Sequence, residues 1–527
     1  MREVLKVALS VVLVGVVPGL AASPAPGSPD HRGTPAADYD GDGFQDLAVG
    51  VPYENLEGAD VAGAVNVLYG TSTGLTAEGN QLWHQDSPGI LGEVETGDSF
   101  GTVLAPADFD GDGFSDLAIT IRDEDVGEEI LAGAVAVLYG SAGGLTAEGN
   151  QLWTRDSPGV KGEASIAEGF GFSLAAGDFN ADGYADLAAG TPWDHVNGEL
   201  YAGSLNVLYG SASGLTAEGD QLWTQDSSGV EDVAEEDDGF ASFLTSGDFN
   251  GDGLSDLAVG VGHEGLDHIE HAGAVNVLFG STAGLSPAGD QFWHQDSPGI
   301  LGEADHDEDF GWFSLSSGDF DGDGFGDLAV GLFGEEVGGD AFAGAVNVFY
   351  GSSAGLSSEG NQLWNQDSPG VESDADIVER FGYDLAAGDF DGDGFADLGI
   401  GVYGEWVRAN NAGAVNVLYG SGSGLSSAGD QLWHQNVPGI ASEPEEGDYF
   451  GTTVAAGDWG NGTADDLAVG AIYETIVGDF GYEGAVHVIY GRPIRGLWAA
   501  GSQFWHQDVP GIPEETEGND FYGYYLA

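Results

Sequence analysis

One sequence unit recurs at intervals of about 70 residues along almost the whole chain. Its most recognisable part is the pattern D-x-[DN]-x-D-G-x-x-D-L, whose copies begin 70, 70, 70, 71 and 70 residues apart, with a decayed copy 69 residues further on. A repeat of this length indicates one supersecondary unit per copy, so it constrains the fold more strongly than chain length does. The copies begin at Asp38, Asp108, Asp178, Asp248, Asp319, Asp389 and, in the decayed form, Asp458.

Each unit offers four short segments of β type. In the first unit, an apolar run at 63–70 is followed by a Gly-Leu turn at 74–75 and by Gln-Leu-Trp at 81–83. A Phe-Gly pair with a second apolar run, as at 170–175, precedes every Asp-rich loop except the first. Gly, Asp, Pro and Ser turns separate the segments, and no helical period lasts three turns. The sequence therefore predicts an all-β fold, a seven-bladed β-propeller of four-stranded blades.

The two ends of the repeat region are complementary halves of one unit. The first unit lacks its Phe-Gly segment, and an extra copy stands at 522–527. Aligned on the third unit, Ala527 corresponds to Ala175, and residues 36–37 correspond to 176–177. A linear stack would instead need capping units at both ends. We expect the carboxyl-terminal strand to complete the first blade, which closes the ring and removes its open edges.

The Asp-rich loops have the composition of calcium sites. Carboxylates stand at loop positions 1, 3, 5 and 9, the carbonyl at position 7 adds an oxygen, and glycines allow the tight curl. Magnesium prefers a tighter octahedron and retains water, so it fits less well. An EF-hand is excluded because position 12 is Val49 or Val330 and not Glu. A plain Asp-Gly hairpin would explain one copy but not this alignment of carboxylates in several copies.

We predict about six calcium ions, with the decayed loop at Asp458 empty because Gly replaces its ligands at positions 3 and 5. Ion binding and folding would be coupled, since carboxylates crowded in a small loop repel one another without metal. The predicted ligands are Asp38, Asp40, Asp42, Phe44 and Asp46; Asp108, Asp110, Asp112, Phe114 and Asp116; Asp178, Asn180, Asp182, Tyr184 and Asp186; Asp248, Asn250, Asp252, Leu254 and Asp256; Asp319, Asp321, Asp323, Phe325 and Asp327; and Asp389, Asp391, Asp393, Phe395 and Asp397.

Charge and composition narrow the possible functions. The 527 residues include 89 Asp and Glu but only 10 Lys and Arg, for a formal charge of −79, and no Cys. This surface excludes binding to nucleic acid or to an anionic membrane, and the absence of Cys excludes disulfides and thiol chemistry. Residues 1–22 read as a secretory signal peptide and 23–35 as a Pro-rich linker before the propeller at 36–527, so we expect a secreted protein. No later segment is long and apolar enough to span a membrane.

The combined motif resembles the FG-GAP repeat. The resemblance is carried by Phe-Gly, then Ala-Gly-Asp-Phe-Asp-Gly-Asp-Gly-x-x-Asp-Leu-Ala-Val-Gly, then Gly-Ala-Val-x-Val-Leu-Tyr-Gly. Similar repeats build the seven-bladed propeller head of integrin α subunits and occur in a glycosylphosphatidylinositol-cleaving phospholipase D. The resemblance implies calcium loops between the first and second strands, and ligands on the opposite face. The leg, membrane and inserted adhesion domains of integrins and the catalytic domain of the phospholipase have no counterpart here, so the fold alone does not define the function.

The expected ligand face combines aromatic and acidic residues. Aromatic residues stand near the start of the loops between strands two and three, beside acidic inter-blade loops: Tyr53, Trp193, Tyr473 and Trp406. Such a face could stack on sugar rings or bind a cationic protein patch. The repeated Gln-Leu-Trp could instead form one sugar site per blade, although packing explains it better. The acidity is a binding feature or an adaptation to salty surroundings.

Three functions remain open on the sequence alone. The leading one is a secreted, calcium-stabilised, non-enzymatic module that binds an extracellular protein or glycan, as in adhesion. A second is a hydrolase or lyase with a site at the central channel, although no Ser/His/Asp arrangement or nucleophile motif recurs. A third is a purely structural surface or matrix component.

Overall fold

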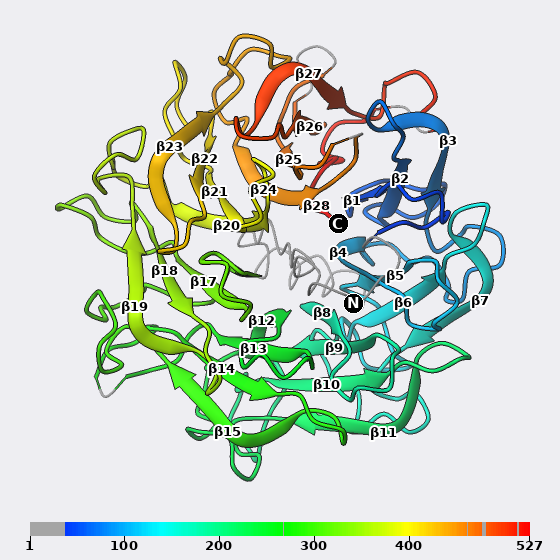
Figure 1. Ribbon diagram of the computed structural model, residues 1–527. Coiled ribbons are helices and arrows are strands. Elements are labelled where there is room, and N and C mark those ends of the chain that lie inside the picture. Colours follow the sequence, from blue (N-terminus) through cyan, green and yellow to red (C-terminus); the bar gives the residue numbers. More distant parts are fainter. Residues whose placement is uncertain (1–36, 267, 461, 477–480, 514–515) are drawn as a thin grey trace.

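Seven antiparallel sheets of four strands surround a central axis in the computed structural model (Figure 1). The structure describes residues 37–527 except 267, 461, 477–480 and 514–515. The predicted signal peptide and linker lie outside the described residues. The chain is therefore an all-β propeller with seven blades, as the 70-residue period predicts.

Each blade uses four strands in chain order, with the first blade completed from the far end of the chain. Blade 1 contains β28 (Tyr525–Leu526), β1 (Leu47–Val51), β2 (Ala64–Tyr69) and β3 (Thr76–Trp83); blade 2 contains β4 (Phe100–Ala107), β5 (Asp116–Ile121), β6 (Ala134–Tyr139) and β7 (Thr146–Trp153); blade 3 contains β8 (Leu174–Gly177), β9 (Asp186–Thr191), β10 (Ser204–Tyr209) and β11 (Thr216–Trp223); blade 4 contains β12 (Phe240–Gly247), β13 (Asp256–Val261), β14 (Ala274–Phe279) and β15 (Ser286–Trp293). Blade 5 contains β16 (Leu315–Gly318), β17 (Asp327–Leu332), β18 (Ala345–Tyr350) and β19 (Ser357–Trp364); blade 6 contains β20 (Phe381–Gly388), β21 (Asp397–Val402), β22 (Ala414–Tyr419) and β23 (Ser426–Trp433); blade 7 contains β24 (Phe450–Gly457), β25 (Asp466–Ala471), β26 (Ala485–Tyr490) and β27 (Trp498–Trp505).

Burial changes from the axis to the perimeter of each blade. The two middle strands, such as β5 and β6, are buried along their whole length because both of their faces pack against neighbouring blades. This explains their continuous apolar runs. The outer strands lie at the perimeter in Figure 1, and in β7 the residues Glu148 and Gly149 are exposed. The first aromatic residue of every Phe-Gly or equivalent pair is fully buried: Phe100, Phe170, Phe240, Phe310, Phe381, Phe450 and Tyr522.

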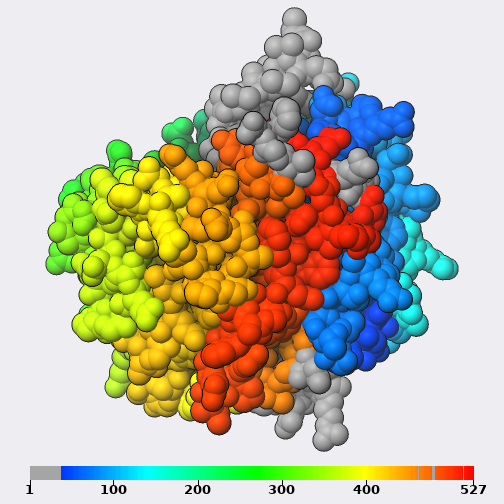
Figure 2. Space-filling model, turned by 90° about the horizontal axis from the view of Figure 1, so that it is seen from above, coloured from blue at the N-terminus to red at the C-terminus, as the bar shows by residue number. Residues whose placement is uncertain are grey.

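The ring closes in the register that the sequence predicts. Val49 pairs with Leu526, and the backbones of Ala48 and Ala527 exchange two hydrogen bonds of 2.6 and 3.0 Å. The N–H of Asp46 donates to the carbonyl of Ala37 at 2.7 Å, which continues the same inner strand from the other end of the chain. Figure 2 shows the carboxyl-terminal part, in red, against the amino-terminal part, in blue.

A recurring clamp of Tyr and Gln side chains joins six blades to the next one. In blade 4, Phe279 stands in place of the Tyr, and Gln291 Oε1 accepts the N–H of Leu356 at 3.0 Å. Tyr139 donates from its hydroxyl to Gln151 Oε1 at 2.6 Å and accepts the N–H of Leu215 in the following blade at 3.1 Å. Gln151 Nε2 then donates to the carbonyl of Leu215 at 2.9 Å. The same arrangement closes the ring between Tyr490, Gln503 of blade 7 and Leu75 of blade 1.

The antiparallel order gives the ring two distinct faces. The loops between the first and second strands, which include the Asp-rich motifs, lie on what we call the Asp-loop face. The loops between the second and third strands and those between successive blades meet on the other face, which we call the junction face. There, for example, the N–H of Phe100 donates to the carbonyl of Ala62 at 2.9 Å. The fold thus separates the metal-type loops from the variable loops.

Candidate metal-binding loops and the opposite face

Each Asp-rich loop is curled around its first carboxylate. In blade 1, Asp38 Oδ1 accepts the N–H of Gly41 at 2.8 Å, and Asp38 Oδ2 accepts the N–H of Gly43 at 3.0 Å. Both glycines have positive φ, 70° and 92°, which a residue without Cβ adopts without strain. The curl brings oxygens of Asp38, Asp40 and Asp42 within 4.8 Å of one another.

The last carboxylate of the loop is buried at the start of the second strand. Asp116 is fully buried, and its two oxygens accept the N–H groups of Phe109 at 2.8 Å and Gly140 at 2.9 Å. Burial, together with the charges of Asp110 and Asp108, raises the pKa of Asp116 to about 8. A bound divalent cation would favour the ionised form of this group. The equivalent residues Asp46, Asp186, Asp256, Asp327 and Asp397 also have pKa values raised to about 8, with burial as the first cause.

The predicted ligands converge in the loops of several blades. Oxygens of Asp108, Asp110 and Asp116 lie within 4.8 Å of one another, and so do those of Asp319, Asp321 and Asp327. In blade 6 the charges of Asp391 and Asp389 contribute to the raised pKa of Asp397, which places all three together. Several Asp-rich groups could therefore hold metal ions, and their all-oxygen donor sets suit hard divalent cations.

Asparagine replaces the third-position carboxylate in blades 3 and 4. Asn180 Oδ1 accepts the N–H of Asp182 at 2.8 Å, and Asn250 Oδ1 accepts that of Asp252 at 2.9 Å. These bonds match the one from Asp42 N–H to Asp40 Oδ1, at 3.1 Å, in blade 1. The loop conformation is thus kept with one negative charge fewer. Coordination by the position-7 carbonyls stays a prediction.

Adjacent Asp-rich loops contact one another around the ring. The carbonyl of Asp38 accepts the N–H of Ser115 in the next loop at 2.9 Å. The ring of Phe114 covers Gly41 so closely that a Cβ there would meet Cε1 at 2.5 Å. The same contact joins Gly111 to Tyr184, Gly251 to Phe325 and Gly322 to Phe395. At the corresponding place in blade 3 stands Ala181, with φ 61°, and the facing position in blade 4 is Leu254, a smaller side chain than an aromatic ring.

The seventh loop keeps its place in the ring with fewer carboxylates. Trp459 donates from Nε1 to the carbonyl of Asp46 at 3.0 Å, and its N–H donates to Asp466 Oδ2 at 3.0 Å. Asp465 Oδ2 accepts the N–H of Asp389 at 2.8 Å. Hydrogen bonds therefore join this loop to blade 6 through Asp465 and to blade 1 through Trp459. Residue 461 lies outside the described residues, and the empty state of this loop stays a prediction.

The junction face has a nearly continuous series of aromatic contacts, which we call the aromatic arc. Its neighbouring rings have centroids 4.4 to 5.8 Å apart, and most of the side chains are half-buried. Sequence reasoning found Tyr53 and Tyr473 but missed the other members, which include Tyr383 on β20 and Tyr403 just after β21. The arc consists of Tyr53, Phe521, Tyr473, Tyr449, Tyr403, Tyr383, Phe313 and Trp312.

The other aromatic residues named from the sequence have different surroundings. Trp193 packs on Phe172 at 4.6 Å, with Arg122 at 5.9 Å from its ring centre, whereas Trp406 is 64% exposed. The Trp of Gln-Leu-Trp is at least partly buried in every blade, and in blade 1 Trp83 donates to Gln81 Oε1 at 3.3 Å. This agrees with a packing role for the repeated Trp.

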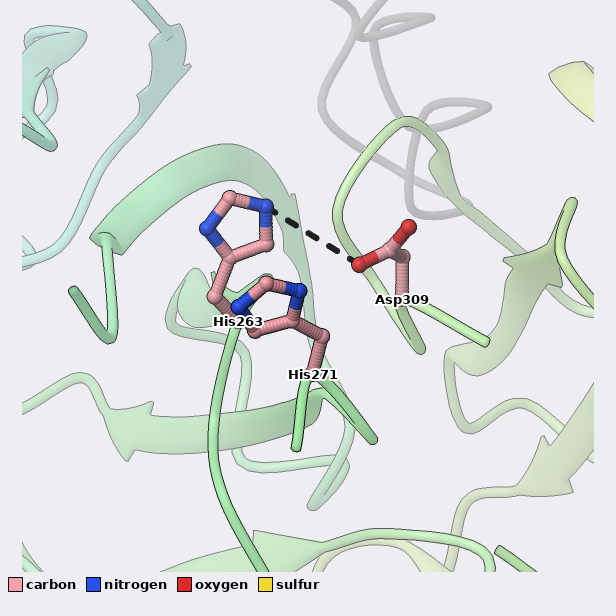
Figure 3. A group of neighbouring side chains, drawn as sticks. All are labelled: His263, His271 and Asp309. Carbon is pink, nitrogen blue, oxygen red and sulfur yellow. Dashed lines mark ion pairs between the residues drawn. The ribbon is translucent and has the colours of Figure 1, made fainter. Parts of the chain in front are cut away.

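A histidine pair extends the arc at the junction of blades 4 and 5 (Figure 3). His263 stacks on Trp312 at 3.9 Å and on His271 at 4.4 Å, and its Nε2 lies 3.9 Å from Asp309 Oδ1. Burial lowers the pKa of His263 to about 4, so the imidazole is neutral at pH 7. Blade 5 has one extra residue between Phe310 and its Asp-rich loop. This extra residue accounts for the single 71-residue step, and Trp312 lies in the same segment.

Comparisons with known proteins agree with the repeat. A sequence model described as "FG-GAP repeat" matches residues 32–68, 100–138, 170–205, 240–278 and 381–418. The chain is 32% identical over 191 residues to the phosphatidylinositol-glycan-specific phospholipase D of Bos taurus, covering 36% of this chain and 21% of that protein. It is 31% identical over 239 residues to integrin alpha-PS2 of Drosophila melanogaster, covering 44% of this chain and 15% of that protein.

The chain therefore contains FG-GAP repeats and is distantly similar to the propeller regions of integrin α subunits and of this phospholipase. The match spans only about a fifth or less of each of these relatives. Among solved structures, the rhamnogalacturonan lyase PL11 of Bacillus licheniformis matches with 13% identity and a TM-score of 0.31, over 70% of this chain and 66% of that one. A TM-score this low supports no functional argument. In the described part of the chain, no helix is long and apolar enough to cross a membrane.

Proposed function

We propose that calcium ions occupy the six complete Asp-rich loops and hold the propeller together in place of disulfides. The supporting observation is the buried ninth-position carboxylate, exemplified by Asp116, which lies beside two further carboxylates. Oxygen cages with several carboxylates suit calcium at about 2.3–2.6 Å, and extracellular modules commonly bind it with Kd values of about 10⁻⁴ to 10⁻³ M. Calcium would bind and stabilise only the folded state, because the unfolded chain has no preformed cage.

Chelation tests this calcium proposal directly. We expect a chelator to lower the melting temperature of the purified chain, and added Ca²⁺ to restore it. Elemental analysis should find Ca²⁺ in the untreated protein. An unchanged melting temperature, or a folded protein without bound calcium, would refute the proposal.

We further propose a secreted, non-enzymatic module that binds an extracellular protein or glycan through the junction face. The aromatic arc carries this proposal, because half-buried rings in a strongly acidic surface suit sugar rings or cationic protein patches. The Asp-loop face would then stabilise the fold, and the junction face would bind the partner. The relatives whose names refer to integrins and a phospholipase share only the propeller region with this chain.

A binding screen with matched variants tests the role of the arc. The chain would be applied to glycan and extracellular-protein arrays in Ca²⁺, alongside a Tyr449→Ala/Tyr473→Ala variant. A Trp498→Ala variant is the control, because Trp498 is 40% exposed at the outer edge of blade 7. We expect the arc variant alone to lose binding. Equal binding by all three proteins would exclude the arc, and turnover of a glycan or phosphodiester would favour an enzyme.

A further inference from the structure

A second repeated set of polar residues lies on the junction face, where each blade meets the next. A Gln stands two positions after the last residue of the fourth strand. Acidic residues stand 10 and 13 positions after this Gln. A Glu at the start of the next blade's loop between strands two and three completes the set. We call each set a junction site. The six sets are Gln85, Glu95, Asp98 and Glu124; Gln225, Glu235, Asp238 and Glu264; Gln295, Asp305, Glu308 and Glu335; Gln366, Asp376, Glu379 and Glu405; Gln435, Glu445, Asp448 and Glu474; and Gln507, Glu517, Asp520 and Glu54.

The Gln and the Glu of each junction site are joined across the blade boundary. Gln225 Nε2 donates to Glu264 Oε2 at 2.7 Å, and Gln366 Nε2 donates to Glu405 Oε2 at 2.6 Å. Equivalent bonds occur at all six junctions. This bond brings an amide head group and a carboxylate from different blades to one point.

The junction of blades 3 and 4 shows how closely the carboxylates gather. Oxygens of Glu235, Asp238 and Glu264 lie within 4.8 Å of one another, and Asp238 and Glu264 are each only 2% exposed. Glu235 donates its N–H to Asp238 Oδ2 at 2.5 Å, which fixes the two acids on one turn. Burial, with Asp238 and Asp232 nearby, raises the pKa of Glu264 to about 9. Three carboxylates here therefore share a small, partly dry volume.

The side-chain amide oxygens of the junction glutamines are buried and have no hydrogen-bond partner among the described residues. Gln225 is 1% exposed and Gln435 is 2% exposed, yet within the described residues no hydrogen-bond donor reaches the Oε1 of either side chain. The amide nitrogen of Gln435 donates to Glu474, and the same side chain is hydrogen-bonded to Asp448, so the unpartnered oxygen belongs to an amide that lies against two carboxylates. All six junction glutamines have this buried, unpartnered oxygen. A buried carbonyl oxygen is unfavourable unless a donor, a water or a cation satisfies it, and a cation would satisfy the neighbouring carboxylates as well.

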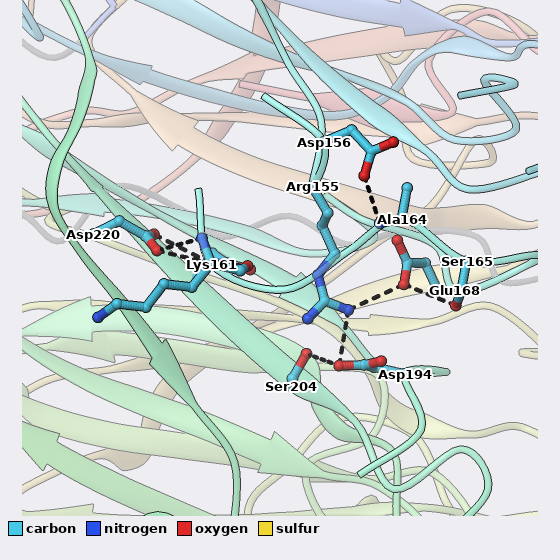
Figure 4. Close-up of polar contacts among 10 residues, drawn as sticks. Arg155, Asp156, Lys161, Ala164, Ser165, Glu168, Asp194, Ser204 and Asp220 are labelled. Atoms are coloured by element: carbon cyan, nitrogen blue, oxygen red, sulfur yellow. Dashed lines mark hydrogen bonds and ion pairs between the residues drawn. The ribbon is translucent and has the colours of Figure 1, made fainter. Parts of the chain in front are cut away.

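The one remaining junction, between blades 2 and 3, contains a positively charged side chain (Figure 4). Between blades 2 and 3, Arg155 replaces the Gln, and its Nη1 lies 3.0 Å from Glu168 and 2.8 Å from Asp194. Ser165 stands where every other junction has its third acid, and Asp194 stands where the other junctions have the longer Glu. The acid count falls from three to two at the one junction where Arg takes the place of the Gln. This substitution indicates that the charge balance of the site includes a positive group.

We propose that the six Gln-containing junctions bind hard divalent cations of the calcium class, forming a second ring of ions on the face opposite the Asp-rich loops. Each site would use three carboxylates and the Gln Oε1, a donor set of hard oxygens. Each ion would join two blades, just as Arg155 joins blades 2 and 3. The alternative is a proton shared between carboxyls, such as Glu308 and Glu335, which are hydrogen-bonded to one another. A shared proton leaves the Gln oxygens unsatisfied and predicts no metal.

Counting ions in the full-length purified chain tests the proposal. After equilibrium dialysis against CaCl₂, we expect about twelve Ca²⁺ per chain by mass spectrometry, six from the loops and six from the junctions. The Asp-rich loops alone would give about six. A count of six that substitutions in those loops abolish would overturn the junction proposal and leave the loop proposal standing.

Exchanging the two kinds of junction gives the sharper test. The variant Q225R/E235S/D238E/E264D copies the Arg155 junction into blade 4 and should lose one ion. The reverse variant R155Q/S165E/D194E should gain one ion. The control E148Q/E218Q makes the same change in net charge as the first variant at two exposed strand residues, and should bind as the wild type does.

The two variants remain informative if one of them misfolds, because they predict opposite changes. Near-ultraviolet circular dichroism would establish that each protein is folded. An unchanged count in a folded junction variant would overturn the proposal. A count that follows the junction variants but not Asp116→Asn would support the junction sites and contradict the loop proposal.

Discussion

The packing between neighbouring Asp-rich loops makes a quantitative prediction about one residue pair. Gly251 has φ 71°, and a Cβ added there would lie 2.5 Å from Phe325 Cε1 and 2.7 Å from Cδ1. Forcing an extra methyl into such a contact costs about 1–3 kcal/mol. Holding a non-glycine residue at positive φ adds about 1 kcal/mol. We therefore expect Gly251→Ala to lower the free energy of unfolding by about 2–4 kcal/mol.

A second substitution should recover the steric part of this loss. Blades 3 and 4 already combine Ala181 with Leu254, so Phe325→Leu should make room for Ala at position 251. We expect a coupling energy of about 1–3 kcal/mol between the two substitutions, because they act through one contact. The backbone part, about 1 kcal/mol, should remain in the double variant.

Gly253→Ala is the matched control within the same loop. Its φ is 86°, but no atom lies within 4 Å of an added Cβ. It should cost only the backbone term, and Phe325→Leu should not change that cost. Guanidinium denaturation in saturating Ca²⁺, with all four combinations for each glycine, would measure these energies. If Phe325→Leu rescued neither glycine variant, or rescued both equally, the steric argument would be wrong.

Three further predictions concern stability and metal binding. Tyr525→Ala should lower the free energy of unfolding by about 3–5 kcal/mol, because this fully buried ring lies in the closing strand; calorimetry against the wild type would show a smaller loss if closure were dispensable. Burial lowers the pKa of His487 to about 3, so its contribution to stability is lost as the pH falls from about 6.5 towards 3. The substitution His487→Asn places at this position the residue that blade 1 has, Asn66. The free energy of unfolding of this variant, minus that of the wild type, should be about 2 kcal/mol larger at pH 5 than at pH 8, as urea titration at both pH values would measure. Asp116→Asn should reduce bound Ca²⁺ by one ion per chain in elemental analysis, and an unchanged count would contradict its assignment as a ligand.

Sequence periodicity predicted the blades and their closure because each depends on local patterns. The Asp-rich loop is a contiguous stretch, so its predicted ligands follow from spacing, whereas its place between the first and second strands is implied by the resemblance to the FG-GAP repeat. The alignment of residues 522–527 with the third unit gave the register in which Val49 pairs with Leu526. Periodicity within a unit therefore defines both the sheet and the loops.

Contacts between units were less accessible from the sequence. The junction sites combine a Gln with a Glu about 39 residues later, across loops that vary in sequence, so composition alone showed only acidic loops. The aromatic arc joins Tyr473 to Tyr449 and Phe521, which come from different kinds of loop. Neither set has a local motif. Aligning the seven units position by position would have shown the recurring Gln and its exchange for Arg155.

The closing strand also places a constraint on how the chain folds. Because β28 pairs with β1, contacts between residues more than 470 positions apart must form before the ring is complete. Until β28 is synthesised, one edge of β1 stays available to strands of other molecules. Such distant contacts slow folding and lengthen the exposure to aggregation. Nascent chains that have not yet released β28 from the ribosome should accordingly remain open rings, whatever stability their completed blades have reached.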